Sequence, residues 1–345
     1  MTMTTALSLT FCTSRQILLK PRPQSWTRTF STCPRPRQSP SRPVDPRITD
    51  LGREIKDEYA EIRAKYDKPK HPVVLAHGLL GFDELRLAGP YVPGIQYWRG
   101  IREALEARDI RVITASVSPS GSIESRAAML SERISSALAP TAAEPGQSYQ
   151  PQSVNIIAHS MGGLDTRYMI SRLQPAGIAV KSLTTIATPH RGSAFADYVM
   201  GEIGEANLPR IYALIERLGF ETGAFSQLTR QYVCEEFNPK TPDAEGTRYF
   251  SYGASLEPTR WSVFKPSHDV VKKLEGGAPN DGLVSVGSSR WGTYKGTILG
   301  VSHLDLINWT SRVKWMLYSL VGTRPNFNAV ALYLDICDML AKEGF

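Results

Sequence analysis

Ser160 has the sequence surroundings of a catalytic nucleophile. It follows the apolar run 154–158 and has small residues on both sides, Ala158 two positions before it and Gly162 two positions after it. A tight turn from a buried strand into a helix needs small residues at these positions and exposes the serine at the end of the strand. The N-terminus of that helix would place a positive potential where an oxyanion forms. The pattern predicts a nucleophile elbow, with alanine where the commoner motif has glycine.

A serine nucleophile needs a base, and in sites of this type the acid and the histidine follow the serine along the chain. This order leaves three histidines. His190 has only Asp165 between itself and the serine, and that aspartate lies one helical turn past the elbow and faces away. His268 lies in a charged segment that we expect to be a loop. His303 follows the apolar run 298–301, where a loop can reach the elbow, and it is the predicted base.

The acid is expected on a turn that follows a strand and precedes the histidine. Asn280-Asp281-Gly282 supplies such a turn before His303. The triplet is by itself only a common turn signal, so the assignment depends on its position in the chain. Asp281 would hold the imidazole in one tautomer and stabilise its charged form. Three other acids are weaker alternatives, namely Asp243, Asp269 and Glu275.

A second donor to the oxyanion is expected in the loop after an early strand. The loop 77–82 follows the apolar run 72–76, and its two glycines let the backbone approach a substrate carbonyl. The N–H of Leu79 would join that of Met161, the residue after the serine, in an oxyanion hole. We interpret His77 as structural, with its ring nitrogens bracing this loop.

The elements that must position these residues alternate along the chain. Apolar runs that predict buried strands recur at 72–76, 111–115, 154–158 and 181–187. Helical periodicity follows them, at about 97–108, at 125–138 and from residue 160 onward. Strands that alternate with helices predict an α/β fold with a mainly parallel central sheet covered on both faces. Residues 196–237 contain only helix-like segments, which predicts a helical insertion.

Ahead of this domain, apolar residues recur at helical spacing. Ile48, Leu51, Ile55, Tyr59, Ile62 and Tyr66 are separated by intervals of three and four, with charged residues between them. This spacing predicts an amphipathic helix that packs on the outside of the main domain.

The positive charge of the chain is confined to its first residues. The 345 residues include 40 Lys+Arg and 33 Asp+Glu, a formal net charge of +7. Residues 1–44 hold seven basic residues and no acid, so the rest of the chain is neutral. A leader rich in Ser, Thr and Arg is typical of a mitochondrial presequence, with an ordinary disordered tail as the alternative. No basic stripe with interleaved aromatic residues exists outside the leader, which argues against a nucleic-acid-binding module.

The spacing of the cysteines and the length of the apolar runs argue against a disulfide-rich or zinc-binding protein and against a membrane-spanning one. Four cysteines without a Cys-x-x-Cys pair support neither a disulfide framework nor a zinc site. No run of 18 apolar residues occurs, so no transmembrane segment is expected.

The motifs occur in an order that resembles a known family. Beside the elbow they comprise residues 77–83, 97–101, 117–119, 187–193, 280–285 and 303–308. The chain is similar to α/β-hydrolase lipases related to the bacterial family I triacylglycerol lipases, and most of all to their fungal mitochondrial relatives. The resemblance implies a leader over 1–44, an amphipathic helix or linker over 45–70 and an α/β-hydrolase domain over 71–345, with a helical lid at about 196–237. Ser160, Asp281 and His303 match the triad, and Leu79 and Met161 match the oxyanion donors.

The activity that this resemblance implies is that of a serine ester hydrolase. It would cleave acylglycerols, triacylglycerol above all, through an acyl-enzyme at a membrane or droplet surface, and it would need no cofactor. A phospholipase, a thioesterase or an acyltransferase would use the same catalytic residues. A catalytically silent scaffold that binds lipid is a further alternative, although a complete triad argues against it.

Two departures from the family pattern bear on a disulfide and on calcium. The bacterial relatives carry a cysteine shortly after the catalytic acid, near the position of Gly287, so Cys234 and Cys337 are expected to remain thiols. The relatives also bind a structural calcium close to the catalytic histidine. Asp305 matches one ligand and Asp269 is the only nearby candidate for another, so calcium is doubtful. Asp305 would otherwise orient the His303 loop.

Overall fold

The computed structural model describes residues 46–79, 97–139, 151–201, 223–309 and 327–345. All of them lie in one compact unit, Val44–Phe345. The predicted leader, most of the loop before residue 152 and the middle of the predicted lid, 202–222, lie outside the described residues.

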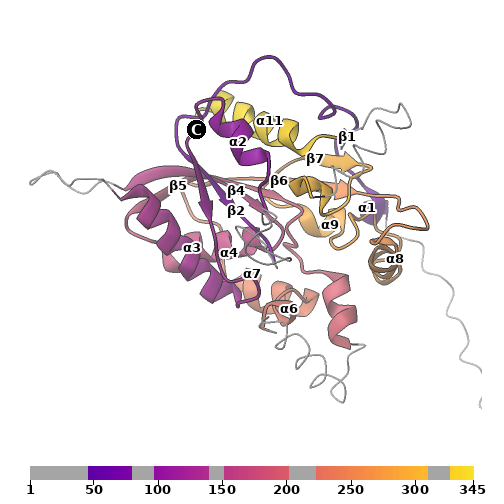
Figure 1. Ribbon diagram of the computed structural model, residues 1–345. Helices are drawn as coiled ribbons and strands as arrows, with labels where there is room; N and C mark the ends of the chain where they lie inside the picture. Colours follow the sequence, from indigo (N-terminus) through magenta and orange to yellow (C-terminus); the bar gives the residue numbers. More distant parts are fainter. Residues whose placement is uncertain (1–45, 80–96, 140–150, 202–222, 310–326) are drawn as a thin grey trace, which may run out of the picture. The chain divides into compact units, whose positions relative to one another are not determined.

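A sheet of seven strands runs through this unit (Figure 1). The strands are β1 (Glu54–Ile55), β2 (Val73–Ala76), β3 (Val112–Ala115), β4 (Gln152–His159), β5 (Ile178–Ile186), β6 (Arg248–Ser255) and β7 (Thr293–Leu299). They are all parallel and follow the order β1-β7-β6-β5-β4-β2-β3. The prediction of a mainly parallel α/β sheet is therefore confirmed.

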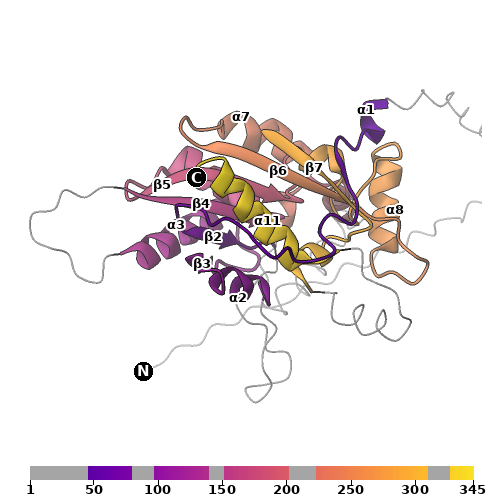
Figure 2. The ribbon, with the colours of Figure 1, turned by 90° about the horizontal axis from the view of Figure 1, so that it is seen from above.

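The strands are continuously apolar because both faces of the sheet are covered. In β2, Val73 and Leu75 pack into one core and Val74 and Ala76 into the other. The first core contains α2 (Ile101–Glu106) and α11 (Ala329–Lys342), and the second contains α3 (Ile123–Leu138) and the turn of helix η1 (Met169–Leu173) that continues α4 (Gly162–Tyr168). Figure 1 shows α2 and α11 together on one side of the sheet and α3 and α4 on the other, and Figure 2, seen from above, shows α11 lying over the strands.

Shorter helices occupy the connections. They are α1 (Pro46–Thr49), α6 (Gly223–Ser226), η2 (Tyr232–Phe237), α7 (Asn238–Lys240), α8 (Lys265–Leu274), α9 (Val286–Ser289) and η3 (Asp305–Ile307). In the predicted lid, 194–201 is helical, as are most of 223–237. Across the described ranges, no helix combines the length and the apolar character that a membrane span requires. Cys234 and Cys337 are free thiols.

The predicted amphipathic helix between Ile48 and Tyr66 is wrong. Only Pro46–Thr49 is helical, and the chain then turns and adds β1 to the edge of the sheet. Contacts with distant segments replace the helical hydrogen bonds, since the carbonyl of Arg53 accepts the N–H of Thr297 (2.8 Å). Asp57 also has a φ of +58°, which no right-handed helix contains. The apolar residues at helical spacing thus serve the sheet edge and its surroundings.

Candidate active site

Ser160 lies in a strained turn between β4 and α4. Its φ is +55°, in the left-handed region that costs a residue with a side chain roughly 1–2 kcal/mol. Two hydrogen bonds hold the turn: the N–H of Ser160 donates to the carbonyl of Ile186 (3.0 Å), and Oγ1 of Thr188 donates to the carbonyl of Ser160 (2.7 Å). The geometry is that of the predicted nucleophile elbow.

Glycines allow the end of β2 to approach this turn closely. A Cβ on Gly162 would lie 2.6 Å from the carbonyl oxygen of Ala76 and 2.7 Å from that of His77. A Cβ on Gly78 would lie 2.7 Å from Cβ of Ser160. Non-bonded heavy atoms in proteins essentially never approach a Cβ this closely, so the first residues of the predicted oxyanion loop pack directly against the serine. Residues 80–82 of that loop lie outside the described residues.

His303 and Asp281 are hydrogen-bonded to each other. Nδ1 of His303 donates to Oδ2 of Asp281 (2.7 Å), and the backbone N–H of His303 donates to the Asp281 carbonyl (3.0 Å). The other carboxylate oxygen of Asp281 accepts the N–H groups of Leu283 (3.0 Å) and Val284 (2.8 Å). An ionised carboxylate only accepts hydrogen bonds, so Nδ1 carries the proton and Nε2 keeps its lone pair. The arrangement suits a general base.

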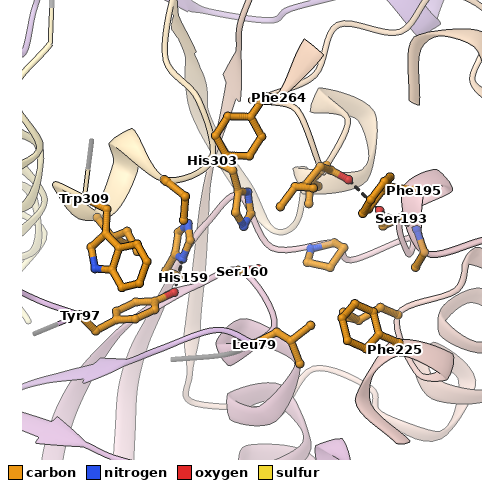
Figure 3. A pocket seen from close by; sticks show the side chains of 17 residues that line it. Leu79, Tyr97, His159, Ser160, Ser193, Phe195, Phe225, Phe264, His303 and Trp309 are labelled. Carbon is orange, nitrogen blue, oxygen red and sulfur yellow. Dashed lines mark hydrogen bonds between the residues drawn. The ribbon is translucent and has the colours of Figure 1, made fainter. Parts of the chain in front are cut away.

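The serine and the histidine lie on one cavity of about 380 Å³ (Figure 3). Most of the other lining residues are apolar or aromatic. The full set is Leu79, Tyr97, His159, Pro189, Ser193, Phe195, Ala196, Phe225, Leu228, Phe264, Leu283, Val284, Leu304, Ile307 and Trp309. Phe195, Ala196, Phe225 and Leu228 come from the helical insertion or its margin. A cavity with this lining suits an acyl chain next to a polar reacting centre.

The two predicted oxyanion donors lie beside the serine, because Met161 follows it in sequence and Leu79 follows Gly78, which packs against it. Within the described ranges, the N–H groups of Leu79 and Met161 donate to no other protein atom. The carbonyl of Gly78 accepts from Nη2 of Arg126 (3.2 Å) and from Nδ1 of His77 (2.9 Å). Because C=O and N–H point in opposite directions across a trans peptide, these two bonds turn the Leu79 N–H away from Arg126.

His77 braces this loop as predicted. Nε2 of its buried ring accepts the N–H of Val117 (3.1 Å), while Nδ1–H donates to Gly78. Burial, with the nearby charge of Arg126, lowers the pKa of His77 to about 4. The ring is therefore neutral near pH 7, as its role as an acceptor at Nε2 requires.

Arg126 is a positioning residue that we did not predict. Its guanidinium is completely buried and donates to Oδ2 of Asp165 (2.9 Å) and to the carbonyl of His77 (2.9 Å). Burial raises the pKa of Asp165 to about 6 against the opposing effect of Arg126. The sequence contained a signal, because Arg126 lies four residues before Leu130 and so on the apolar face of α3.

Tyr97 and His159 form a second network that we did not predict. The hydroxyl of Tyr97 accepts the N–H of Gly78 (3.1 Å) and lies 2.7 Å from Nδ1 of His159. Burial raises the pKa of Tyr97, so the phenol keeps its proton and donates it to Nδ1. The His159 ring lies 4.6 Å from that of His303 between centroids, and burial holds its pKa well below the usual range. A neutral imidazole thus backs the predicted base (Figure 3).

The histidines that were set aside lie elsewhere. His190 is buried, bonded through Nε2 to Oγ1 of Thr185 (2.9 Å), and stacked on Trp291. His268 lies within α8, so the expectation of a loop there is wrong. The charged residues of that segment form ion pairs on the exposed face of the helix, for example between Lys265 and Asp269. The opposite face, which includes His268 and Val271, is buried.

Two of the alternative acids are engaged with other partners, because Asp243 accepts from Nε1 of Trp291 (2.9 Å) and Asp269 pairs with Lys265. The third, Glu275, lies outside the cavity lining, and burial raises its pKa. The turn that carries Asp281 follows α8 rather than a strand. The end of β6 still reaches it, because the N–H of Leu256, the residue after β6, donates to the carbonyl of Asn280 (2.8 Å).

Asp305, the predicted candidate for a calcium ligand, is hydrogen-bonded within its own loop. Oδ2 of Asp305 accepts from the N–H (3.0 Å) and the hydroxyl (2.7 Å) of Ser302, which ties the carboxylate to its own loop. In the part of the chain that the structure describes, no three His, Cys, Asp or Glu side chains gather as a metal site. These contacts favour the alternative role of Asp305, which is to orient the His303 loop.

Known proteins are similar to this chain in fold and in sequence. Residues 115–203 match a family of PGAP1-like alpha/beta domains. Among solved structures, Staphylococcus hyicus lipase superposes with a TM-score of 0.56 over 81% of this chain and 98% of that one, at 21% identity, which shows a common fold.

Two curated relatives are more similar in sequence. The triacylglycerol lipase of Vibrio cholerae is 30% identical, over 81% of this chain and 90% of that protein. Triacylglycerol lipase 2 of Saccharomyces cerevisiae is 35% identical over 318 residues, which make up 81% of this chain and 94% of the yeast protein. The chain therefore belongs to the triacylglycerol lipase family of α/β-hydrolases.

Proposed function

We propose that this protein hydrolyses ester bonds of acylglycerols, triacylglycerol above all, through an acyl-enzyme. The observation that carries the proposal is that a strained serine and a histidine bonded to a buried aspartate line one apolar cavity. The names of the yeast and Vibrio relatives support triacylglycerol as the substrate class.

The proposed reaction assigns one step to each polar group. Oγ of Ser160 attacks the ester carbonyl carbon while Nε2 of His303 takes the hydroxyl proton. The N–H groups of Leu79 and Met161 stabilise the oxyanion of the tetrahedral intermediate. His303 then donates its proton to the glycerol oxygen, the C–O bond breaks, and the acyl group stays on Ser160. A water molecule then gives a proton to His303 and attacks the acyl carbon. The bond from that carbon to Oγ of Ser160 breaks, His303 returns the proton to Oγ, and the fatty acid leaves.

The contacts of Asp281 support its place in this reaction. Its hydrogen bond to Nδ1 fixes the tautomer in which Nε2 is free to accept a proton, and its negative charge stabilises the imidazolium that follows. The N–H groups of Leu283 and Val284 keep this carboxylate oriented. Every proton in the sequence of steps comes from the Ser160 hydroxyl or from water, so we infer that the reaction itself needs no cofactor.

Replacement of the nucleophile tests the proposal. We expect Ser160→Ala to lower kcat by about 10,000-fold or more, because the hydroxyl of the nucleophile elbow, which forms the acyl-enzyme, is removed. The measurement is hydrolysis of triacylglycerol, phospholipid and acyl-CoA side by side, with labelling by a fluorophosphonate probe. Ser171→Ala, a change outside the cavity, is the control. A Ser160→Ala protein that hydrolyses a short-chain ester at the wild-type rate would refute the mechanism, and an unlabelled wild type would favour a silent scaffold.

We also propose that residues 1–44 direct the protein to mitochondria. The support is the sequence of this segment, with seven basic residues, no acid and many Ser and Thr residues. A reporter fused to residues 1–44 should enter mitochondria. A matched fusion in which the seven basic residues are replaced by Gln should remain in the cytosol. Equal distribution of the two fusions would contradict the proposal.

A further inference from the structure

Two large apolar side chains are almost fully exposed on one loop. Trp261 is 93% exposed and Val263 is 82% exposed, whereas Ile62, which comes next among the large apolar residues of the described ranges, is 46% exposed. Both lie between β6 and α8, in the loop 256–264, which we call the docking loop. Single exposed apolar residues are common on proteins, but two adjacent ones that are nearly free of protein contacts need a reason.

Hydrogen bonds within the docking loop give it a defined shape. The N–H of Ser262 donates to the carbonyl of Thr259 (3.0 Å), and the N–H of Lys265 donates to the carbonyl of Ser262 (3.0 Å). Phe264 donates its N–H to Oγ of Ser262 (3.3 Å). The exposure of Trp261 therefore follows from an ordered turn that directs its side chain outward.

The root of the docking loop belongs to the wall of the active-site cavity. Phe264 is buried and lines the cavity beside His303 (Figure 3). A Cβ on Gly282 would lie 2.7 Å from the Phe264 ring, so this ring rests on the turn that carries Asp281. Phe264 lies three positions after Trp261, a reach of about 10 Å at full extension. The exposed tip therefore lies close to the reacting centre.

The charged residues around the tip match a lipid surface. Arg260 is exposed, and in the described part of the chain it has no ion-pair partner. Two lysines of α8 lie next to the loop and are paired with acids. Lys265 forms an ion pair with Asp269, and Nζ of Lys272 lies 3.6 Å from Oε1 of Glu257. Indole rings favour the boundary between headgroups and acyl chains, and a neighbouring arginine can reach the phosphate level. The docking loop thus has an apolar tip, one free cation and little net charge.

We propose that the docking loop inserts Trp261 and Val263 into the surface of a lipid layer and so holds the active-site cavity against that layer. The proposal rests on the proposed function, because the layer is where an acylglycerol substrate would be found. The apolar tip provides most of the attraction, and Arg260 contributes a contact with headgroup phosphate.

Vesicle binding by the full chain tests this proposal. Phosphatidylcholine vesicles have no net charge, so the basic leader adds little to binding. We expect Trp261→Ser with Val263→Ser to weaken co-sedimentation with these vesicles by about tenfold or more, because two apolar side chains lose a buried environment. The matched control is Ile62→Ser with Leu173→Ser, which removes two exposed apolar residues elsewhere and should bind like the wild type.

A conservative variant reports the insertion directly. Acyl chains that carry bromine quench an inserted indole, so vesicles made with them should quench part of the wild-type tryptophan fluorescence. Trp261→Phe should lose this quenching and still bind, because phenylalanine also inserts. Quenching that is equal in the wild type and in Trp261→Phe would overturn the proposal.

Enzyme assays separate this proposal from the proposed function. The docking-loop double variant should hydrolyse a soluble short-chain ester at the wild-type rate and emulsified triacylglycerol more slowly. Loss of the soluble-ester activity would overturn docking, as would unchanged vesicle binding or a wild-type dimer that the variant splits. Vesicle binding is measured in a Ser160→Ala background, so that turnover does not alter the lipid. Trp261-dependent binding, together with a protein that keeps Ser160 and hydrolyses no ester, would refute the proposed function and leave docking intact.

Discussion

Ser160 depends on its small neighbours as much as on its hydrogen-bonded partners. Its own φ of +55° disfavours any side chain at that position, so the rest of the turn must hold it in place. Gly162 and Gly78 allow the backbone of β2 and its loop to do so from two directions. The atoms that a new Cβ would meet at Gly162 are backbone carbonyls, which cannot move without moving the strand.

Gly162→Ala should therefore damage the site. The added methyl group would lie 2.6 Å from the carbonyl of Ala76, and relief of that clash displaces either the serine or the Leu79 loop. A displacement near 1 Å costs about 100-fold in rate, so we expect kcat on a soluble ester to fall by at least that factor. The Tm should fall as well.

A glycine on α9 provides the control for this substitution. No heavy atom lies within 4 Å of a Cβ on Gly287, so Gly287→Ala should keep the wild-type kcat and Tm. A Gly162→Ala enzyme with wild-type kcat would show that the turn tolerates a side chain and that the close approach has no catalytic importance.

At the scale of elements, several strands could be predicted because they depend on the local pattern of apolar residues. Strands buried on both faces are apolar runs, so β2, β4 and β5 were recognised at their positions. The prediction of a helix around Ile55 was wrong because a short strand and several turns can also bury apolar residues that recur at intervals of three and four. The register between Ile55 and Ile298 decides the structure there, and no local pattern contains it.

The candidate site divides in the same way. Ser160 could be found from a strand, a turn and a helix that are contiguous in sequence. The assignment of Asp281 and His303 depended as well on their order along the chain. In the structure, Nδ1 of His303 and Oδ2 of Asp281 form a hydrogen bond of 2.7 Å. Arg126 and Tyr97 act through contacts between segments that are far apart in the chain, and such contacts leave only weak traces in a single sequence, such as a charged residue on an apolar helix face.

At the scale of the whole molecule, three buried histidines make stability depend on pH. Burial lowers the pKa of His77, His159 and His190 below the value of 6.5 that an exposed histidine has. As the pH falls below 6.5, these histidines take up protons in the unfolded chain but not in the folded one. Their contribution to stability is thus fully present above that pH and is lost as the pH falls toward the folded pKa values. For His77, with a folded pKa of about 4, the loss reaches about 3 kcal/mol.

Asp165 has the opposite effect, because its folded pKa of about 6 lies above the value of 3.8 for an exposed aspartate. As the pH falls through 6, the folded protein gains the proton first, which favours folding. Glu275 and Asp335, whose pKa burial also raises, act in the same direction. The ordinary pKa of a carboxyl is about 4 and that of an imidazole about 6.5, so protonation of the three imidazoles dominates between pH 7 and pH 5. We therefore expect the urea midpoint of unfolding to fall over this range at constant ionic strength. His190→Gln removes one of these imidazoles at a distance from the cavity and should make the decline less steep. A midpoint that is constant or rises over this range would contradict the prediction.

The two-residue strand β1 makes the protein mechanically asymmetric. It pairs only with β7, at the edge of the sheet, and the segment that follows is tied to α11 partly by an ion pair between the exposed guanidinium of Arg63 and the buried carboxylate of Asp338. The opposite end of the chain is α11, whose residues are buried in the core along most of its length. A pulling force on the N-terminal end thus begins with two ladder positions, whereas the same force on the C-terminal end must first extract a core helix. If residues 1–44 lead the chain into an import channel, the channel pulls on the end that unravels with the least resistance.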